Sequence, residues 1–138
     1  MIKTKTLRNI IRRLIQNWAA PFGCGLLFLC LLNFIFFFGY VPSNSMYPTI
    51  RENSLLFGIR IFNELERGDI VIFEHENSLL VKRIADVPGD VVVIGGKNRI
   101  VPDGFYFMRG DNTAYSVDSR YWADPLVPKE RIIARVVY

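Results

Sequence analysis

Residues 18–40 read "WAAPFGCGLLFLCLLNFIFFFGY", and this stretch divides the chain into parts of different character. It holds no charged residue in 23 positions, and Asn33 is its only strongly polar side chain. At about 1.5 Å of rise per residue, a helix of this length can cross a hydrocarbon core of roughly 30 Å. Pro21 lies near the start, where a helix tolerates proline best. The stretch therefore predicts a transmembrane segment over residues 18–40.

A cleavable signal peptide is the main alternative for this segment. The apolar region of a signal peptide is usually only about 7–15 residues long and ends in small residues. Here the run is longer and ends in aromatic residues (Phe36, Phe37, Phe38 and Tyr40), which favours an uncleaved signal anchor. A buried core helix fits less well, because no face of the segment is polar enough to meet water.

The charges on the two sides of the segment predict its orientation. Residues 1–17 carry a formal charge of +5 with no acidic residue, whereas the rest of the chain has a formal charge of −1. Basic residues next to a transmembrane segment favour the cytoplasmic side, so we expect a cytoplasmic tail over 1–17 and an extracytoplasmic domain over 41–138. Nucleic-acid binding is disfavoured, because the domain offers phosphates no net positive charge.

The two cysteines, Cys24 and Cys30, both lie inside the apolar run. Six residues apart on a helix, they point in different directions and cannot form a disulfide. No cysteine follows them, so the domain after the anchor depends on its hydrophobic core. The whole chain of 138 residues has room for one modest domain besides the anchor.

The pattern after Tyr40 is typical of β structure. Short runs of branched and aromatic residues alternate with segments rich in Gly, Pro, Asp and Asn, and Gly95–Gly96 suits a tight hairpin. We expect strands near residues 54–62, 69–74, 79–85, 90–94, 98–101, 105–109 and 131–137. The fold class predicted is mainly β, with one transmembrane helix followed by a small antiparallel, barrel-like domain.

Lys82 breaks the pattern of its strand, "LLVKRIA". Alternate residues of a strand share a face, so Lys82 stands between Leu80 and Ile84 on one side. One interpretation is an edge-strand lysine that opposes aggregation or extends to solvent. The other is a desolvated lysine whose lowered pKa lets the neutral amine act as a general base.

A base of this kind needs a nucleophile, and "PSNSMYPTI" at residues 42–50 offers one. Ser45 lies in a loop that Pro42 and Pro48 restrain, and the Ser43 hydroxyl could point to the same place. His75 is the only histidine and lies in the turn-like "EHEN", where we expect it to be solvated. A Ser–His–Asp arrangement is therefore improbable, and a Ser–Lys dyad remains. One histidine and scattered carboxylates give no metal-ligand spacing, and we expect no cofactor.

A long polar stretch, "RGDNTAYSVDSRYW", occupies residues 109–122. Asp118 could pair with Arg120, and Asp111 with Arg83. Most polar loops are only turns, but one this long in a small domain more often has a functional reason.

These stretches together resemble the type I signal peptidases, membrane-bound Ser–Lys endopeptidases that remove signal peptides. "PSNSMYPTI" resembles the nucleophile motif of that family, and "RGDIVIF" at 67–73 is similar to its next block. "VKRIADVPGD" at 81–90 resembles the block that holds the basic lysine, and "VPDGFYFMRGDNTAYSVDSRYW" at 101–122 resembles the last block. The likeness spans nearly everything from Pro42 to Trp122.

The resemblance implies a role for each matching residue. Ser45 would be the nucleophile and Lys82 the general base, with the Ser45 N–H and the Ser43 hydroxyl stabilising the oxyanion. Ser116 would orient the lysine amine, with two ion pairs in support: Asp111 with Arg83, and Asp118 with Arg120. Three residues would line shallow pockets for small side chains at the substrate's −1 and −3 positions: Met46, Leu80 and Val81.

The resemblance also implies partners and a location. The partners expected are signal peptides of preproteins and membrane lipid, with the secretion translocon as a further candidate. The location expected is the bacterial plasma membrane, with an organelle inner membrane as the alternative. The chain departs from the family pattern at Asn44, Thr113 and Ala123, and it lacks the large β insertion of longer relatives. Two other functions stay open: a peptidase specialised for one pilin or conjugation protein, and a non-catalytic binding module tethered to the membrane.

Overall fold

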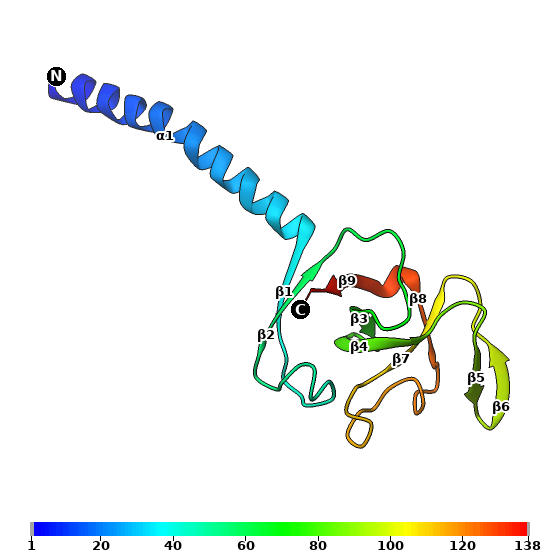
Figure 1. Cartoon of the computed structure of the whole chain (residues 1–138). Helices are drawn as coiled ribbons and strands as arrows, with labels where there is room; N and C mark the ends of the chain where they lie inside the picture. Colours follow the sequence, from blue (N-terminus) through cyan, green and yellow to red (C-terminus); the bar gives the residue numbers. More distant parts are fainter. Residues whose placement is uncertain (1, 138) are drawn as a thin grey trace. The chain divides into compact units, whose positions relative to one another are not determined.

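The structure is a computed structural model, which describes the backbone of residues 2–137 and the side chains of residues 15–137. The chain divides between Ile35 and Phe36 into two compact units. The first is a helix and the second is a β domain (Figure 1).

The first unit is the helix α1, Ile2–Ile35, and its last 21 residues are long and apolar enough to cross a membrane. None of this apolar window is buried within the structure, and large side chains such as Phe22, Leu26 and Phe34 are exposed. Lipid is the environment that suits such a surface. By length and composition, α1 fits the predicted membrane segment.

The boundary of the helix differs from the predicted range of 18–40. The helix ends at Ile35, and Phe36–Tyr40 forms the strand β1, which pairs antiparallel with β2 at Leu55–Ile59. A short apolar run is compatible with helix or strand, and aromatic residues favour a strand when a partner is present. Here Phe57 of β2 is the partner, and its ring lies 5.2 Å from that of Phe38.

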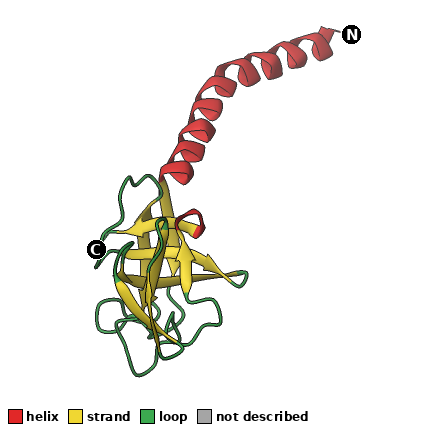
Figure 2. Cartoon of the chain, turned by 90° about the vertical axis from the view of Figure 1, so that its right-hand side faces the viewer, coloured by secondary structure: helices red, strands yellow, loops and turns green. Residues whose placement is uncertain are grey.

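The second unit is an antiparallel sheet with the strand order β1-β2-β9-β3-β4-β7-β8, and β5 and β6 form a separate hairpin (Figures 1 and 2). The remaining bounds are β3 Ile70–His75, β4 Ser78–Asp86, β5 Val91–Ile94, β6 Lys97–Ile100, β7 Phe105–Arg109, β8 Leu126–Pro128 and β9 Ile132–Val136, with a short 3₁₀ helix η1 at Lys129–Arg131. The mainly β, antiparallel class is confirmed. The sheet stays open, because β1 and β8 are its edges.

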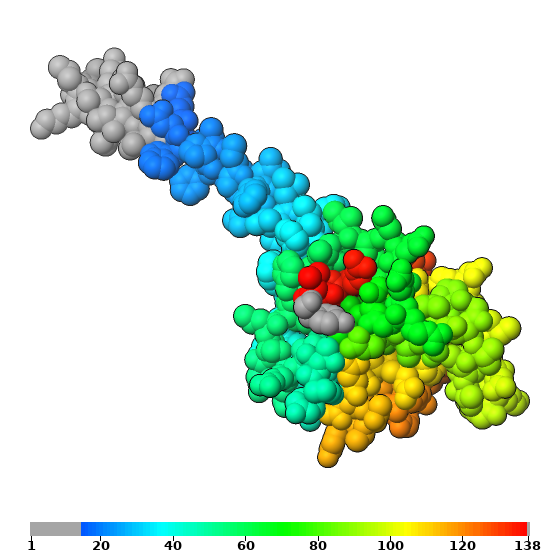
Figure 3. All heavy atoms as spheres, viewed as in Figure 1, coloured from blue at the N-terminus to red at the C-terminus, as the bar shows by residue number. Residues whose placement is uncertain are grey.

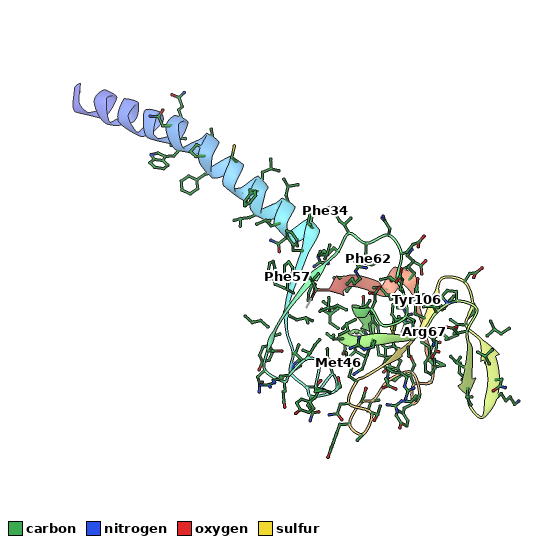
Figure 4. All side chains as sticks on the ribbon, viewed as in Figure 1. Phe34, Met46, Phe57, Phe62, Arg67 and Tyr106 are labelled. Atoms are coloured by element: carbon green, nitrogen blue, oxygen red, sulfur yellow. The ribbon has the colours of Figure 1, made fainter. Side chains whose placement is uncertain are left out.

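The central strand β3 explains where the core lies. Its alternate residues enter two different clusters, with Ile70 and Ile72 in one and Val71 and Phe73 in the other. A strand buried on both faces reads as a continuous apolar run, which is what "IVIF" is. The cluster of Ile70 and Ile72 also contains Met46 from the loop between β1 and β2 (Figure 4), so the core reaches the nucleophile motif.

The expectation that His75 is solvated was wrong. It is the last residue of β3, only 6% exposed, and its ring stacks on Trp122 with 4.0 Å between the ring centroids. The turn signals of "EHEN" apply to the residues after it: Glu76 and Asn77 have positive φ and make the turn into β4. Trp122 lies far along the sequence, so no local signal predicts the stacking.

Candidate active site

The loop between β1 and β2 is held firmly although it is polar. Its neck is closed by two backbone hydrogen bonds, in which Val41 N–H donates to Ser54 O at 3.0 Å and Asn53 N–H donates to Val41 O at 2.8 Å. Val41, Met46 and Ile50 are buried in the core beneath it. Apolar side chains thus fix the loop from below, and its serines remain at the surface.

Ser45 and Lys82 meet although 37 residues separate them in the chain. Lys82 Nζ donates to Ser45 Oγ at 2.7 Å, and Ser43 Oγ lies 3.4 Å from the same Ser45 oxygen. When the amine is neutral, the hydroxyl can donate to Nζ across the same contact. The two groups are therefore placed for proton transfer between them.

The strand β4 accounts for the burial of Lys82. Leu80, Lys82 and Ile84 share a face, as the alternation predicts, and Lys82 is only 4% exposed. Because the side chain is buried, a lysine that extends to solvent at a strand edge does not describe it. Burial lowers the pKa of the Lys82 ammonium below its usual 10.5, and the negative charge of Asp118 opposes that shift in part.

The polar loop after β7 forms a buried network around Asp118, which is fully buried. Ser116 Oγ donates to Asp118 Oδ2 at 2.8 Å, the Gly110 N–H donates to the same oxygen at 2.9 Å, and Arg120 Nε donates to Oδ1 at 2.8 Å. Burial would raise the pKa of the Asp118 carboxyl, but these hydrogen bonds outweigh it and hold the pKa below its usual range. The carboxylate is therefore charged and fixed.

A second ion pair joins this loop to β4. Arg83 Nε donates to Asp111 Oδ1 at 2.7 Å, and Arg83 Nη2 donates to Oδ2 at 2.6 Å. Burial opposes ionisation of Asp111, but the hydrogen bonds from Arg83 and Thr49 lower its pKa overall. Since Arg83 follows Lys82 directly, this bidentate pair ties the loop to the strand that carries the lysine.

An apolar cleft of about 340 Å³ opens beside Ser45 and Lys82. Its walls are residues 37–43, from β1 into the nucleophile loop, and the β4 segment 79–82, together with Met46, Leu56 and Ile72. β1 is an edge of the sheet, and the 79–82 segment has a described partner strand only on its β3 side. The cleft thus lies between two unpaired strand edges, and the predicted pocket residues Met46, Leu80 and Val81 all line it.

Gly110 and Asn112, from the start of the polar stretch at residues 109–122, lie at the site, and neither was predicted to be a site residue. Gly110 packs so closely that an added Cβ would lie 2.1 Å from Ser116 Oγ and 2.6 Å from Ser45 O. Asn112 donates two hydrogen bonds to the nucleophile loop, from its backbone N–H to Ser45 O and from Nδ2 to Asn44 O, both at 3.0 Å. The loop of residues 41–54 and the loop of residues 110–125 lie side by side on one face (Figure 3). For Gly110, a glycine between polar residues was the only feature of the sequence that could have indicated close packing.

Comparison with known proteins places the chain in a family. The chain matches the family described as "Signal peptidase, peptidase S26" over residues 15–100 and 93–138. It is 35% identical over 130 residues to "Probable signal peptidase I-2" of Synechocystis sp., covering 70% of this chain and 59% of that protein. It is 31% identical to "Signal peptidase I" of Leptolyngbya laminosa, covering 71% and 65% of the two chains, and 29% identical to "Signal peptidase I S" of Bacillus subtilis, covering 79% and 80%. The matches therefore span less than two thirds of the first two relatives. The matched ranges and these identities show that the chain belongs to the signal peptidase family of S26 peptidases.

Proposed function

We propose that this chain is a membrane-anchored serine endopeptidase that removes signal peptides from secreted preproteins with a Ser45–Lys82 dyad. The observation that carries the proposal is the 2.7 Å contact between Ser45 Oγ and the amine of Lys82, a residue that is only 4% exposed. Membership of the signal peptidase family supports the same conclusion.

The dyad performs acyl transfer in two steps. Neutral Lys82 takes the proton of Ser45 as Oγ attacks the scissile carbonyl, and it then gives that proton to the leaving amine as the C–N bond breaks. The product of this step is an ester on Ser45. A water molecule next gives a proton to Lys82 and attacks the ester, and the proton returns to Ser45 as the peptide leaves. No other titratable group is required.

Two donors face the negative charge that develops on the carbonyl oxygen. The Ser45 N–H lies on the rigid loop, and the Ser43 hydroxyl is close to Ser45 Oγ. Loss of one such donor typically costs about 10²–10³ in rate. Ser116 assists the base: its proton is donated to Asp118, so its lone pairs are free to accept a hydrogen bond from Lys82 and orient the amine. The ion pairs of Asp118 with Arg120 and of Asp111 with Arg83 hold these parts in place.

The cleft is suited to an extended peptide. A substrate that enters between the unpaired edges of β1 and β4 can bond to both as an added strand. Alternate side chains of an extended peptide point the same way, so the −1 and −3 residues face the same wall. Met46, Leu80 and Val81 line that apolar wall, and the proposal, following the family resemblance, is that they accept small side chains at both positions.

Membrane lipid is the second partner proposed. The apolar helix segment Ile15–Ile35 would span the plasma membrane with the basic residues before it in the cytoplasm and the β domain outside. The strands β1 and β2 of the domain also expose apolar side chains along their length, including Phe38, Tyr40 and Leu55. Such a surface fits the membrane boundary, where a signal peptide emerges. The secretion translocon is the source from which such a substrate would arrive.

The proposal is tested with the full chain in detergent and a preprotein substrate. Ser45→Ala and Lys82→Ala should each abolish cleavage and retain the thermal unfolding transition. Lys97→Ala, which changes an exposed lysine on the β5–β6 hairpin, is the matched control and should cleave like wild type. Wild-type cleavage by either dyad variant would refute the mechanism. Cleavage of one pilin-type substrate alone, within a panel of preproteins, would instead indicate a specialised peptidase.

A further inference from the structure

Asn112 forms hydrogen bonds to the backbone of the nucleophile loop. Its side-chain amide Nδ2 donates to the Asn44 carbonyl at 3.0 Å, and its backbone N–H donates to the Ser45 carbonyl, also at 3.0 Å. The two carbonyls belong to consecutive peptide groups, on either side of the Ser45 Cα. Asn112 therefore fixes the orientation of the backbone on both sides of the nucleophile.

The peptide group between Asn44 and Ser45 has two ends with different tasks. It is trans, and in a planar trans peptide the C=O and the N–H point in opposite directions. Its N–H is the oxyanion donor of the proposed mechanism, and its C=O is the acceptor for Asn112. The hydrogen bond from Asn112 to the Asn44 carbonyl therefore orients the Ser45 N–H away from Asn112. The same bond polarises the peptide group, so that the N–H becomes a stronger donor.

Asn112 is itself held in one place. Its backbone carbonyl accepts the N–H of Ser116 at 2.9 Å and the N–H of Tyr115 at 3.1 Å, which closes a turn. The preceding residue, Asp111, is fixed by its bidentate pair with Arg83. Because its backbone is restrained on both sides, the side-chain amide of Asn112 is preorganised and does not need to be ordered when the substrate binds.

We propose that Asn112 is a positioning residue for the oxyanion hole, acting through the peptide group that joins Asn44 to Ser45. This inference rests on the proposed function, since it requires Ser45 to be the nucleophile. Asn112 contacts no reacting atom in this arrangement. Its effect is on the transition state, where the oxyanion exists, and only weakly on substrate binding.

The expected loss of rate on substitution of Asn112 depends on the hydrogen bonds that remain in the variant. The backbone N–H of residue 112 still holds the Ser45 carbonyl in any variant except proline, and the Tyr47 N–H also donates to the Asn44 carbonyl at 3.1 Å. Loss of the amide therefore loosens the oxyanion donor without removing it. Removal of a donor costs about 10²–10³ in rate, so we expect a loss of about tenfold for Asn112→Ala.

The experiment compares Asn112→Ala and Asn112→Asp with wild type, Asn98→Ala and Ser45→Ala in detergent. Asn112→Asp keeps the shape of the side chain and places an acceptor against the Asn44 carbonyl, so its loss should exceed that of Asn112→Ala. The measurements are kcat and KM on a signal peptide substrate, the pH profile, and the affinity for two ligands. One ligand is a peptide aldehyde, which forms a tetrahedral oxyanion adduct with the serine, and the other is the cleaved product peptide.

The inference predicts that kcat and aldehyde affinity fall by the same factor in each variant, while KM and product affinity stay at wild-type values. In the uncharged variant, Asn112→Ala, the acid limb of the pH profile should also stay at its wild-type position. Asn98→Ala, an exposed change on the β5–β6 hairpin, should behave as wild type. An unchanged kcat in both Asn112 variants would overturn the inference, and so would a kcat loss without loss of aldehyde affinity. A shifted acid limb in Asn112→Ala, which adds no charge, would also overturn it, because it would place the effect on Lys82. If Ser45→Ala still cleaves, the proposed function itself fails.

Discussion

Gly110→Ala is the substitution for which the structure makes the sharpest prediction. An added Cβ would lie 2.1 Å from Ser116 Oγ, 2.4 Å from Ser116 Cβ and 2.6 Å from the Ser45 carbonyl oxygen, whereas ordinary contacts begin at 3.4 Å. The Ser116 side chain or the Ser45 backbone must therefore move by about 1 Å. Rotation of Ser116 would not relieve the clash, because its Cβ and a backbone oxygen are also too close.

The displacement falls on the groups that the mechanism needs. A misplacement of about 1 Å can cost about 10²-fold in rate, and overpacking of this kind costs about 1–3 kcal/mol of stability. We expect kcat for preprotein cleavage to fall about 10²-fold, together with a decrease in the free energy of unfolding from denaturant titration. Gly58→Ala is the control: its added Cβ meets Arg135, Ala134 and Ile72 at 3.1–3.3 Å and none of the residues of the nucleophile loop or the Asp118 network, so stability should change much more than kcat. Wild-type kcat for Gly110→Ala would refute the close packing described for the site.

Three further predictions follow from the same site. Cleavage should fall in acid as Lys82 is protonated, with an apparent pKa below 10.5, and Asp118→Asn should move this acid limb to lower pH because it removes a charge that raises the lysine pKa. Lys82→Met should be inactive but at least as stable as wild type at neutral pH by thermal unfolding. Burial lowers the lysine pKa in the folded chain, so below pH 10.5 the unfolded chain binds the proton more readily and the wild type loses stability. The free energy of unfolding of the wild type should therefore increase as the pH rises towards 10.5. Asn44→Gly should keep wild-type kcat in the cleavage assay, because the loop uses the Asn44 carbonyl and its side chain is exposed.

The sequence was most informative where one residue broke a local pattern. Alternation along β4 placed Lys82 between Leu80 and Ile84, and the burial of that face follows directly from it. The seven predicted strands each correspond to an observed strand, with ends that differ by three residues at most. Both expected ion pairs are present. They could be predicted because each joins residues in motifs that the family resemblance already grouped.

The features that escaped prediction depend on partners distant in the chain. The residues of β1 looked like the end of the membrane segment, and only the pairing with β2 makes them a strand. β8 has three residues and ends in Pro128, so it carries no periodicity to detect. Asn112 lies in a stretch of polar residues that look alike in sequence, and its hydrogen bonds to Asn44 and Ser45 cross more than 60 positions.

The ion pair of Asp118 with Arg120 affects the pKa of Lys82, and therefore the pH at which the proposed base is neutral. Burial lowers the lysine pKa and Asp118 raises it, so a free carboxylate here would favour the charged ammonium. Arg120 Nε and Nη2 donate to both oxygens of Asp118 at 2.8 and 2.9 Å and offset that charge. Arg120→Met should therefore move the acid limb of cleavage to higher pH, opposite in direction to Asp118→Asn, and the carbon stem of methionine replaces most of the lost packing. Shifts of the two variants in the same direction would contradict this account, because a purely structural role for the pair gives no reason for opposite signs.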